Sequence, residues 1–421
     1  MTTLIPKFDF KNGGATPAGA VNLPINEKLQ QFINVMDFGA DPTGVANSTT
    51  AIQNAINYAV AANNGLPNTV YLPAGTFKIT ANLNITNAVW IRGQSQQTTT
   101  INIVSATAST VFSVYTGLGN TVQILGGGIS NLVLECNSNC KGIQLRALTP
   151  YPITRMVFEN VWIKNATQGI DVLGDSGNVC YFNTFRNINI ANNASSLNGF
   201  LINGAAYNLI EQVESTGVSN GGNGFNITQI GGAIRNLTTD GVSFIDIPFG
   251  SLDTYTCETI NASSPSNSTC LRINRAISAN NICLQDVDNA KCANGISLGT
   301  SVSSLNNVNF VNTTTTAPAY SLTLTAGGAG VISNFYVPGG ATFKLESYTS
   351  AALMQSYKFV GCSTITLASN LGTNLVTALP TPAEIYRGNM LILKGGAGVT
   401  DHTYVCQKNA ADAYTWVQID N

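Results

Sequence analysis

The sequence predicts an all-β protein whose chain winds into a parallel β-helix, and three observations lead to that prediction. Charged residues make up only 10% of the 421 residues, against about 25% in an ordinary globular domain. The polarity of the chain therefore comes largely from Asn, Thr and Ser, which favour strands and tight turns over helices. One short phrase recurs through the middle of the chain, and a single amphipathic helix precedes its first copy.

The recurring phrase has the pattern x-Asn-apolar-x-apolar, as in "SNLVL" (130–134) and "ENVWI" (159–163). Copies return at steps of 21 to 29 residues, apart from one step of 50 residues in which Asn261 is a weak occupant. A turn glycine that enters a short alternating strand follows most copies about ten residues later, as in "KGIQL" (141–145). Strands with this length and period describe coils that bury their apolar side only by stacking. The second position of the phrase is held by Asn131, Asn160, Asn187, Gln212, Asn236, Asp286, Asn307 and Asn334.

That second position predicts a polar column along the stack. In a parallel stack, equivalent residues of neighbouring coils lie about 4.8 Å apart. Asn and Gln side chains at this spacing can donate to and accept from the copies above and below, which satisfies polar groups at a bend. We therefore expect Asn131, Asn160 and Asn187 to lie along one axis.

The stretch "NSTTAIQNAINYAVAANNG" (47–65) predicts an α-helix that covers the first coil. The end of a β-helix is an open stack of unpaired backbone groups, which needs a cover. Thr50 and Gln53 fit a capping box at the start, and Gly65 fits a helix stop. The apolar stripe that would face the coil consists of Ile52, Ala55, Ile56, Ala59 and Val60.

Three segments also resemble known proteins. "INVMDFGADPTGVANSTTAIQNAI" with "VYLPAGTFKI" (33–56 and 70–79) resembles the opening segment of the pectate-lyase-like right-handed β-helix superfamily. The stretch "IPKFDFKNGGATPAGAVNLPINEKLQQFINVMDFGAD" (5–41) is similar to the virion-attachment and neck segment of bacteriophage tailspike proteins. The C-terminal stretch from "YRGNMLILKGG" (386–396) onward resembles a small terminal module of phage tail proteins. For the rest of the chain the likeness is one of architecture.

The resemblance implies three parts and a set of partners. Residues 1–35 would be a virion-attachment arm and neck, residues 36–345 the capping helix and a right-handed parallel β-helix, and residues 346–421 a C-terminal β module. The protein would be a homotrimer that joins phage tail or portal-adaptor proteins through residues 1–35. It would bind a host surface glycan and, as many relatives do, cleave it. It would be assembled in the host cytoplasm, belong to the virion tail and be exposed extracellularly.

Other locations and partners are disfavoured by the sequence. The start, "MTTLIPKFDFKNGG", lacks a basic region followed by an apolar one, so no signal peptide is expected. No apolar run approaches the roughly 18 residues of a membrane helix, so membrane insertion is not expected. The formal net charge of −2 gives no reason to expect nucleic acid as a partner.

Carboxylates are scarce, so the candidate catalytic residues are few. Hydrolysis of a glycosidic bond needs two carboxylates roughly 5 to 10 Å apart, whereas a lyase needs a base and a cation near a uronic carboxyl. The position before the Asn column predicts a stacked ladder in which Glu159 and Glu211 lie two coils apart, about 10 Å. Glu214 is expected in the same area. The alternative interpretation is a surface ion ladder that fixes strand register. The ladder consists of Glu159, Arg186, Glu211 and Arg235.

A second candidate group is Asp171 and Asp175 in "QGIDVLGDSGN" (168–178). Asp171 is expected to point outward, because Ile170 and Val172 take the core side of the strand. Asp175 falls in the glycine-rich turn that follows. A catalytic role and an Asp that hydrogen-bonds its own turn are the two alternatives.

Trp162 lies between the core-facing residues Val161 and Ile163, so it is expected to point outward. There it would stack on a sugar, with Arg186 and Arg235 as further substrate-binding residues. A contact buried between subunits of a trimer is the alternative.

Metal and cofactor chemistry is not expected. The nine cysteines include the close pair Cys136 and Cys140, for which small buried thiols are favoured over a metal site or a disulfide. The only histidine, His402, lies beyond the predicted β-helix. A Ser-His-Asp site on the coils would therefore have no base, and a His-rich metal site cannot form within one chain.

We therefore expect a phage tailspike that recognises host polysaccharide, with cleavage by a glycosidase or lyase mechanism left open. The first alternative is a non-catalytic receptor-binding spike of the same fold. The second is a secreted polysaccharide lyase or glycosidase.

Overall fold

The computed structural model forms two compact units, residues 1–265 and 266–421, and each is described by itself. The description covers residues 7–8, 23–24, 33–62, 68–105, 107, 110–117, 121–138, 140–175, 179–191, 198–217, 223–257, 269–285, 294–302, 304–311, 319–324, 331–336, 342–347, 364–367, 375–376, 378–379, 381–383, 390–393, 395–409 and 411–419.

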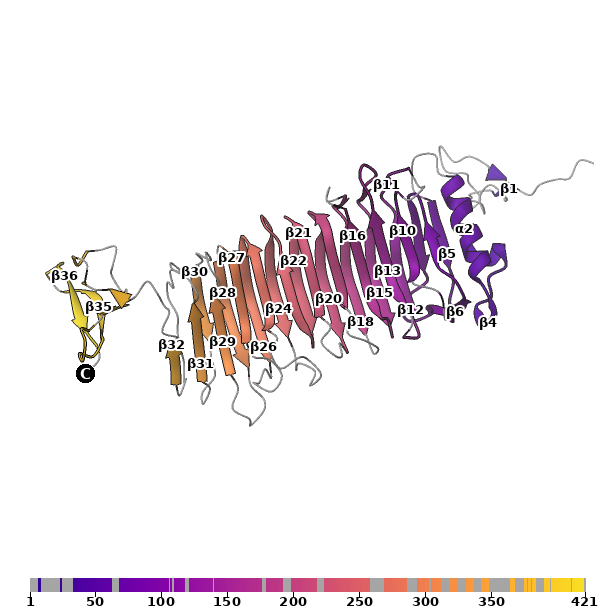
Figure 1. Cartoon of the computed structure of the whole chain (residues 1–421). Coiled ribbons are helices and arrows are strands. Elements are labelled where there is room, and N and C mark those ends of the chain that lie inside the picture. Colours follow the sequence, from indigo (N-terminus) through magenta and orange to yellow (C-terminus); the bar gives the residue numbers. More distant parts are fainter. Residues whose placement is uncertain are drawn as a thin grey trace, which may run out of the picture. The chain divides into compact units, whose positions relative to one another are not determined.

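The first unit is a parallel β-helix made from two long sheets and a set of shorter strands (Figure 1). The first sheet contains, in order, β3 (Ile33–Asn34), β5 (Asn68–Leu72), β8 (Val89–Gly93), β12 (Gly128–Glu135), β15 (Val157–Lys164), β18 (Thr184–Ala191), β20 (Leu209–Thr216), β22 (Ala233–Thr239) and β24 (Ser251–Cys257). The second contains β7 (Leu83–Ile85), β10 (Thr110–Tyr115), β13 (Lys141–Ala147), β16 (Gln168–Gly174), β19 (Phe200–Ala206), β21 (Asn223–Ile230) and β23 (Val242–Asp246). The shorter strands are β4 (Thr43–Asn47), β6 (Gly75–Ile79), β9 (Thr99–Ile103), β11 (Ile124–Leu125), β14 (Ile153–Thr154) and β17 (Cys180–Tyr181).

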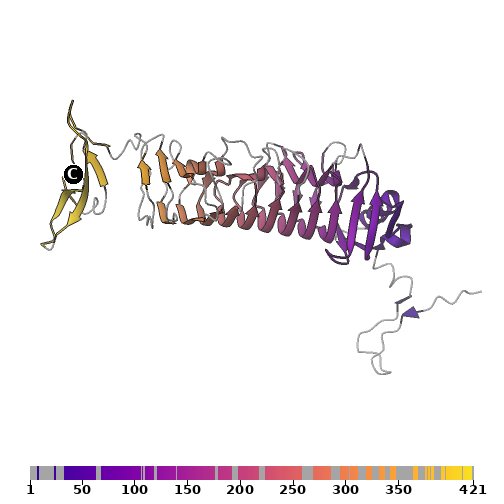
Figure 2. The ribbon, with the colours of Figure 1, turned by 90° about the horizontal axis from the view of Figure 1, so that it is seen from below.

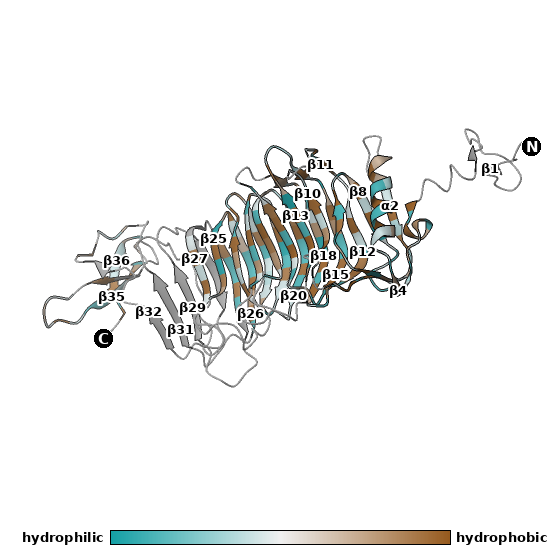
Figure 3. Ribbon diagram, turned by 45° about the vertical axis from the view of Figure 1, so that its right-hand side comes forward, coloured by the Kyte–Doolittle hydropathy of each residue, from teal (hydrophilic) through white to brown (hydrophobic). Residues whose placement is uncertain are grey.

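Neighbouring strands of each sheet come from successive coils, as Figure 2 shows from below. Apolar and polar residues alternate along the strands, which Figure 3 shows as alternating brown and teal bands. The inward side chains form a continuous core in which Phe158 stacks on Phe185 at 5.0 Å and Phe185 meets Phe200 at 5.3 Å between ring centroids. Each such burial stabilises the fold by about 1.5–3 kcal/mol. The predicted fold, a parallel β-helix, is confirmed.

The predicted polar column lies in the first sheet, and its residues share a left-handed backbone. The φ angles of Asn131, Asn160 and Asn187 are 58°, 53° and 49°, in the region that Asn tolerates better than most residues. The Asn160 amide donates to Asn131 at 2.9 Å and the Asn187 amide donates to Asn160 at 2.6 Å. The left-handed residue bends the strand, so that Phe158 and Val161, three positions apart, both face the core. This bend explains why apolar residues follow the Asn in the recurring phrase.

The sequence predicts Asn261 and Asp286 as members of the column, and both predictions are wrong, because other residues hold these positions. After Gln212 and Asn236, the next coil places Thr254 in the column, with a φ of 60°, and Asn261 lies outside the described residues. In the second unit, Asn281 holds the position, with a φ of 55°, and it accepts a hydrogen bond from Asn307 at 3.0 Å. Asp286 also lies outside the described residues. The pairing of Asn306 with Ser333 and of Val308 with Phe335 brings Asn334 into register with Asn307, as predicted.

The α-helix found among the described residues, α2 (Thr49–Ala61), lies at the N-terminal end of the coils and packs against β5, β7 and β8 (Figures 1 and 2). Its buried residues are Ala51, Ile52, Ala55, Ile56 and Ala59. The predicted capping box is wrong, because the N-cap is Ser48, and Gln53 instead exchanges hydrogen bonds with the backbone of Asn84 in β7. The helix ends at Ala61, before the predicted stop at Gly65, which lies outside the described residues.

The loop before the helix explains the "DFGADPTG" phrase. Before it, η1 (Val35–Phe38) ends at Gly39, which has a φ of 86°. The Asp41 carboxylate accepts hydrogen bonds from Thr43, Val45 and Ala46. These bonds lower the pKa of Asp41 to about 2, the hydroxyl of Thr43 contributing most. The residue thus fixes the turn that leads the chain into the helix.

The second unit holds further parallel strands and one small sheet. One parallel set consists of β25 (Thr269–Ala276), β27 (Asn294–Val302), β29 (Ala319–Leu324), β31 (Thr342–Ser347) and β32 (Thr364–Leu367). The other consists of β26 (Ser278–Gln285), β28 (Ser304–Val311) and β30 (Val331–Tyr336). The small sheet consists of β33 (Leu375–Val376), β34 (Met390–Leu393), β35 (His402–Lys408) and β36 (Tyr414–Gln418).

The small C-terminal sheet is predominantly antiparallel and contains both His402 and Trp416, which confirms the predicted β module. Near the N-terminus, β1 (Lys7–Phe8) pairs with β2 (Leu23–Pro24). The rest of the arm that the sequence predicts lies outside the described residues, apart from 33–35. The boundaries at 35 and 345 remain predictions.

Candidate functional site

The predicted ladder is formed on the outer face of the first sheet. Strand pairing places Glu159 beside Arg186, Arg186 beside Glu211, and Glu211 beside Arg235. The Glu159 carboxylate accepts a hydrogen bond from the Arg186 guanidinium at 2.5 Å. That bond raises the pKa of Arg186, and the charge of Glu211 contributes to a smaller degree. The guanidinium therefore stays charged between two carboxylates.

Strand pairing adds one residue to the ladder that the sequence did not reveal. Asp253 in β24 pairs with Arg235, so the alternation of sign continues for another coil. The segment "DTYTC" (253–257) has Thr254 where the copies in the preceding coils carry Asn or Gln, so it does not match the recurring sequence pattern. We refer to Glu159, Arg186, Glu211, Arg235 and Asp253 as the charged ladder.

A second outward column runs beside the charged ladder. Trp162 pairs with Asn189, and Asn189 pairs with Glu214, to which its amide donates at 2.8 Å. Trp162 is 37% exposed, which confirms its predicted outward direction. The Lys164 ammonium lies 3.6 Å from the centre of the Trp162 ring, a cation–π contact that the sequence interpretation missed. The indole and a positive charge therefore lie together on this face.

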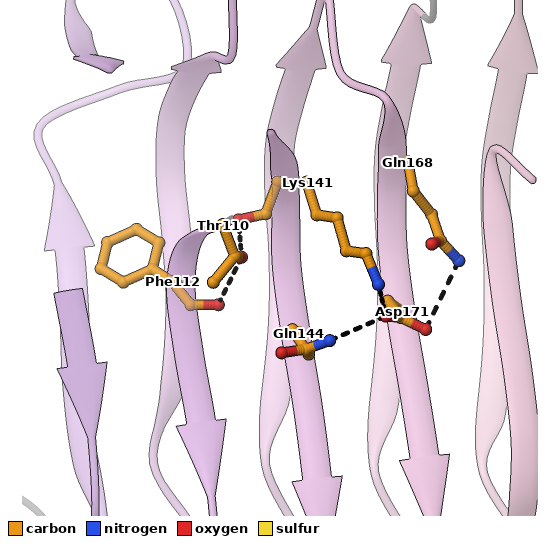
Figure 4. Close-up of polar contacts among 7 residues, drawn as sticks. Thr110, Phe112, Lys141, Gln144, Gln168 and Asp171 are labelled. Carbon is orange, nitrogen blue, oxygen red and sulfur yellow. Dashed lines mark hydrogen bonds and ion pairs between the residues drawn. The ribbon is translucent and has the colours of Figure 1, made fainter. Parts of the chain in front are cut away.

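Asp171 lies in the second sheet, away from the charged ladder. It is on the outer side of β16, as the buried Ile170 and Val172 predict, yet it has no exposed surface. Its carboxylate pairs with the Lys141 ammonium and accepts from Gln144 at 2.9 Å and from Gln168 at 3.4 Å (Figure 4). A buried carboxylate needs such partners. These contacts link β13 to β16 and leave Asp171 no surface for a ligand.

Asp175 also binds a neighbouring coil. It accepts hydrogen bonds from the backbone and the hydroxyl of Thr149, both at 2.6 Å. The alternative in which Asp175 bonds its own turn therefore receives no support from these contacts. The structure separates Asp171 and Asp175 from the site on the first sheet.

The structure thus gathers six of the eight predicted site residues on one surface, which we call the charged face. Its acidic groups stand beside arginines that can bind or neutralise a carboxyl group, and Trp162 offers an aromatic surface. Within the described residues there is no cluster of three or more metal-ligating side chains. The charged face consists of Glu159, Trp162, Arg186, Glu211, Glu214 and Arg235.

Cys136 and Cys140 are both buried and form no disulfide. The Cys140 thiol lies 3.6 Å from the carbonyl of Cys136. The hydrogen bond with the Cys140 thiol raises the pKa of Cys136, and burial contributes to a smaller degree. Both thiols behave as small core side chains here, as predicted.

The fold and this surface define a class of protein, the parallel β-helices that carry polar and charged groups on an outer sheet face. Residues 32–297 match the family described as "Rhamnogalacturonase A/epimerase, pectate lyase-like". The chain therefore belongs to this family. Among the described residues, no helix is long and apolar enough to cross a membrane.

Individual relatives cover different parts of the chain. Mannuronan C5-epimerase AlgE5 of Azotobacter vinelandii is 35% identical over 111 residues, which are 25% of this chain and only 11% of that protein. The A-module of mannuronan C-5 epimerase AlgE6 from the same organism superposes with a TM-score of 0.58 at 16% identity, over 80% of this chain and 99% of that module. Tailspike protein 3 of bacteriophage CBA120 is more distant, with a TM-score of 0.49 at 12% identity over 98% of this chain and 73% of that chain.

Proposed function

We propose that this protein binds a bacterial surface polysaccharide along its charged face, as a tailspike of a bacteriophage. The observation that carries the proposal is the register of the first sheet, which aligns the charged ladder with a parallel column that contains Trp162. A face of this kind suits an extended polymer, because charged groups recur from coil to coil along the stack. The aromatic ring supplies apolar contact and the arginines supply charged hydrogen bonds.

The class of ligand is supported by the relatives. The relative that is 35% identical over 111 residues is named for its action on mannuronan, a polysaccharide. The phage role is supported by the resemblance of residues 5–41 to tailspike attachment segments. In this proposal the protein is a homotrimer, and residues 1–35 join it to the tail.

Binding to purified polysaccharide tests this function. The parent protein is expected to bind host capsule or lipopolysaccharide, and Trp162→Ala is expected to weaken binding about tenfold, because an aromatic contact is lost. Tyr58→Ala, which removes an exposed ring from α2, is the matched control. If Trp162→Ala binds as well as the parent does, the charged face is not the binding surface.

Cleavage of the bound glycan is a second candidate function, and the surroundings of Glu211 favour it. Glu211 lies in register between two arginines, and Glu214 follows three positions later on β20. Glu211 would act with Glu214 or Glu159 as the acid and base in hydrolysis, and an arginine would neutralise a uronic carboxyl in a lyase. Glycan fragments should then form with the parent and disappear with Glu211→Gln or Glu159→Gln. If the parent releases no fragments, the non-catalytic spike remains.

The phage assignment has its own test. Virions assembled with a chain that lacks residues 1–30 should lose the protein. Retention on the particle would count against the attachment arm and leave glycan binding untouched.

A further inference from the structure

We propose that one corner of the β-helix carries an aromatic platform, formed by Phe182 and Tyr207, on which a sugar ring of the bound polysaccharide stacks. This inference rests on the function proposed above and adds a second set of contacts beside the charged face.

The corner is a column of residues in register, one from each coil, located immediately before the strands of the first sheet. Backbone hydrogen bonds fix this register: the amide of Phe182 donates to Ala206, that of Tyr207 to Ile230 and that of Gly231 to Pro248. All six residues have a φ between 53° and 82°. The column consists of Gly126, Arg155, Phe182, Tyr207, Gly231 and Phe249.

The backbone of this corner makes bulky side chains costly. A positive φ suits Gly and is tolerated by Asn, whereas a large aromatic residue there is strained. Gly126 and Gly231 show that glycine fits the corner. Phe182 and Tyr207 are nevertheless present, with φ angles of 55° and 53°. Strain of this kind occurs where a side chain is needed at a ligand site.

The two rings are held in a defined arrangement although they face solvent. Phe182 is 51% exposed and Tyr207 is 50% exposed. Their ring centroids are 5.5 Å apart and their planes differ by 21°, and Tyr181 packs edge-on against Phe182. The Tyr207 ring lies where a side chain of residue 231 would be, since a Cβ there would be 2.4 Å from Cε1 of Tyr207. Gly231 therefore makes room for the platform.

The surroundings indicate a charged polysaccharide as the occupant. Phe182 precedes Arg186 by four residues, and Tyr207 precedes Glu211 by four, so the Cα atoms of each of these two pairs lie within about 13 Å of one another. The exposed residue Arg155 occupies the position of Phe182 in the preceding coil. An apolar sugar face fits the aromatic rings, and the hydroxyl or carboxylate groups of the sugar fit the charges of Arg155 and of the charged ladder. An apolar protein partner would have to desolvate these charges.

Asparagine variants test the platform, because Asn tolerates the positive φ of the corner and lacks the aromatic ring. We expect Phe182→Asn and Tyr207→Asn to bind a polysaccharide probe about tenfold more weakly than the parent, with an unfolding temperature that is unchanged or higher. Phe182→Tyr, which retains the ring, should bind as the parent does. Val45→Asn, at an exposed apolar position on β4, is the control. The probes are size-defined host capsule oligosaccharides, polymannuronate and neutral dextran.

Three other outcomes would contradict the inference, and each would point to a different reason. Parent-like affinity in both Asn variants overturns the platform and leaves the proposed function standing. A change in the mass of the assembled protein in these variants shows that the corner is a subunit contact. If the parent binds none of the probes, the platform and the proposed function both fail.

Discussion

In the part of the chain that the structure describes, two ion pairs connect neighbouring coils of the β-helix, and their surroundings are opposite. Arg186 and Glu159 lie on the first sheet with 48% and 30% of their side chains exposed, whereas Asp171 on the second sheet is completely buried beside Lys141. An exposed pair contributes little to stability and keeps its charges available to a ligand. A buried pair holds the fold and offers a ligand nothing, and its loss is costly. The same pairing of charges across one coil step therefore leaves charges accessible on one sheet and stabilises the fold on the other. In the proposed function, the accessible charges bind the polysaccharide.

The largest effect is expected at the buried pair. Asp171→Leu leaves the Lys141 ammonium and the amides of Gln144 and Gln168 without their acceptor. We expect a loss of about 2–3 kcal/mol in the free energy of unfolding, below the value for a fully buried pair because 27% of the Lys141 side chain is exposed. Urea unfolding measures this loss.

The matched control for the buried pair removes both charges at once. Lys141→Met combined with Asp171→Leu should recover most of the lost stability, because no unpaired charge remains. A single variant as stable as the parent would show that Asp171 does not hold the coils together.

The next largest loss of stability is expected in the Asn column. Here the cause is the backbone conformation, not an unpaired charge. Asn187→Ala keeps a φ of 49° that Ala tolerates poorly and loses the bond to Asn160. We expect a loss of about 2 kcal/mol in the free energy of unfolding. Asn187→Gly, which accepts this φ, should lose clearly less. Equal losses in the two variants would count against the left-handed backbone as the reason for Asn.

The smallest effect is expected at Asp41, a half-buried residue whose carboxylate accepts hydrogen bonds from its own loop. Its pKa is lowered from 3.8 to about 2, so the folded state favours the charged form. This contribution is present above about pH 4 and is lost as the pH falls through about 2. Unfolding temperatures measured between these values should fall less steeply for Asp41→Asn than for the parent. Parallel curves would mean that these hydrogen bonds do not stabilise the loop.

Much of the fold could be predicted because the left-handed position selects a residue type. Asn or Gln fills it in five consecutive coils, from Asn131 to Asn236, and the spacing then gives the register of the charged ladder. The prediction failed after Asn236 because the next position is held by Thr254, only 18 residues later. A phrase that tolerated Thr and a shorter step would have found this coil and Asp253.

The rest of the site could not be predicted, for two physical reasons. Alternation along β16 shows which face Asp171 occupies, but it does not show whether that face is covered. The corner of Phe182 and Tyr207 has no common residue type, because Gly, Arg, Phe and Tyr all occupy it, so only the backbone angles identify it. Its strain is visible in the structure and has no counterpart in the sequence pattern.

The most direct test of this account is one titration of host oligosaccharide against the parent protein, Arg186→Met, and the double variant that lacks both Lys141 and Asp171 charges. We expect Arg186→Met to bind about tenfold more weakly while its unfolding free energy changes by less than about 1 kcal/mol, and the double variant to bind as the parent does. Parent-like binding by Arg186→Met, or weakened binding by the double variant alone, would contradict it.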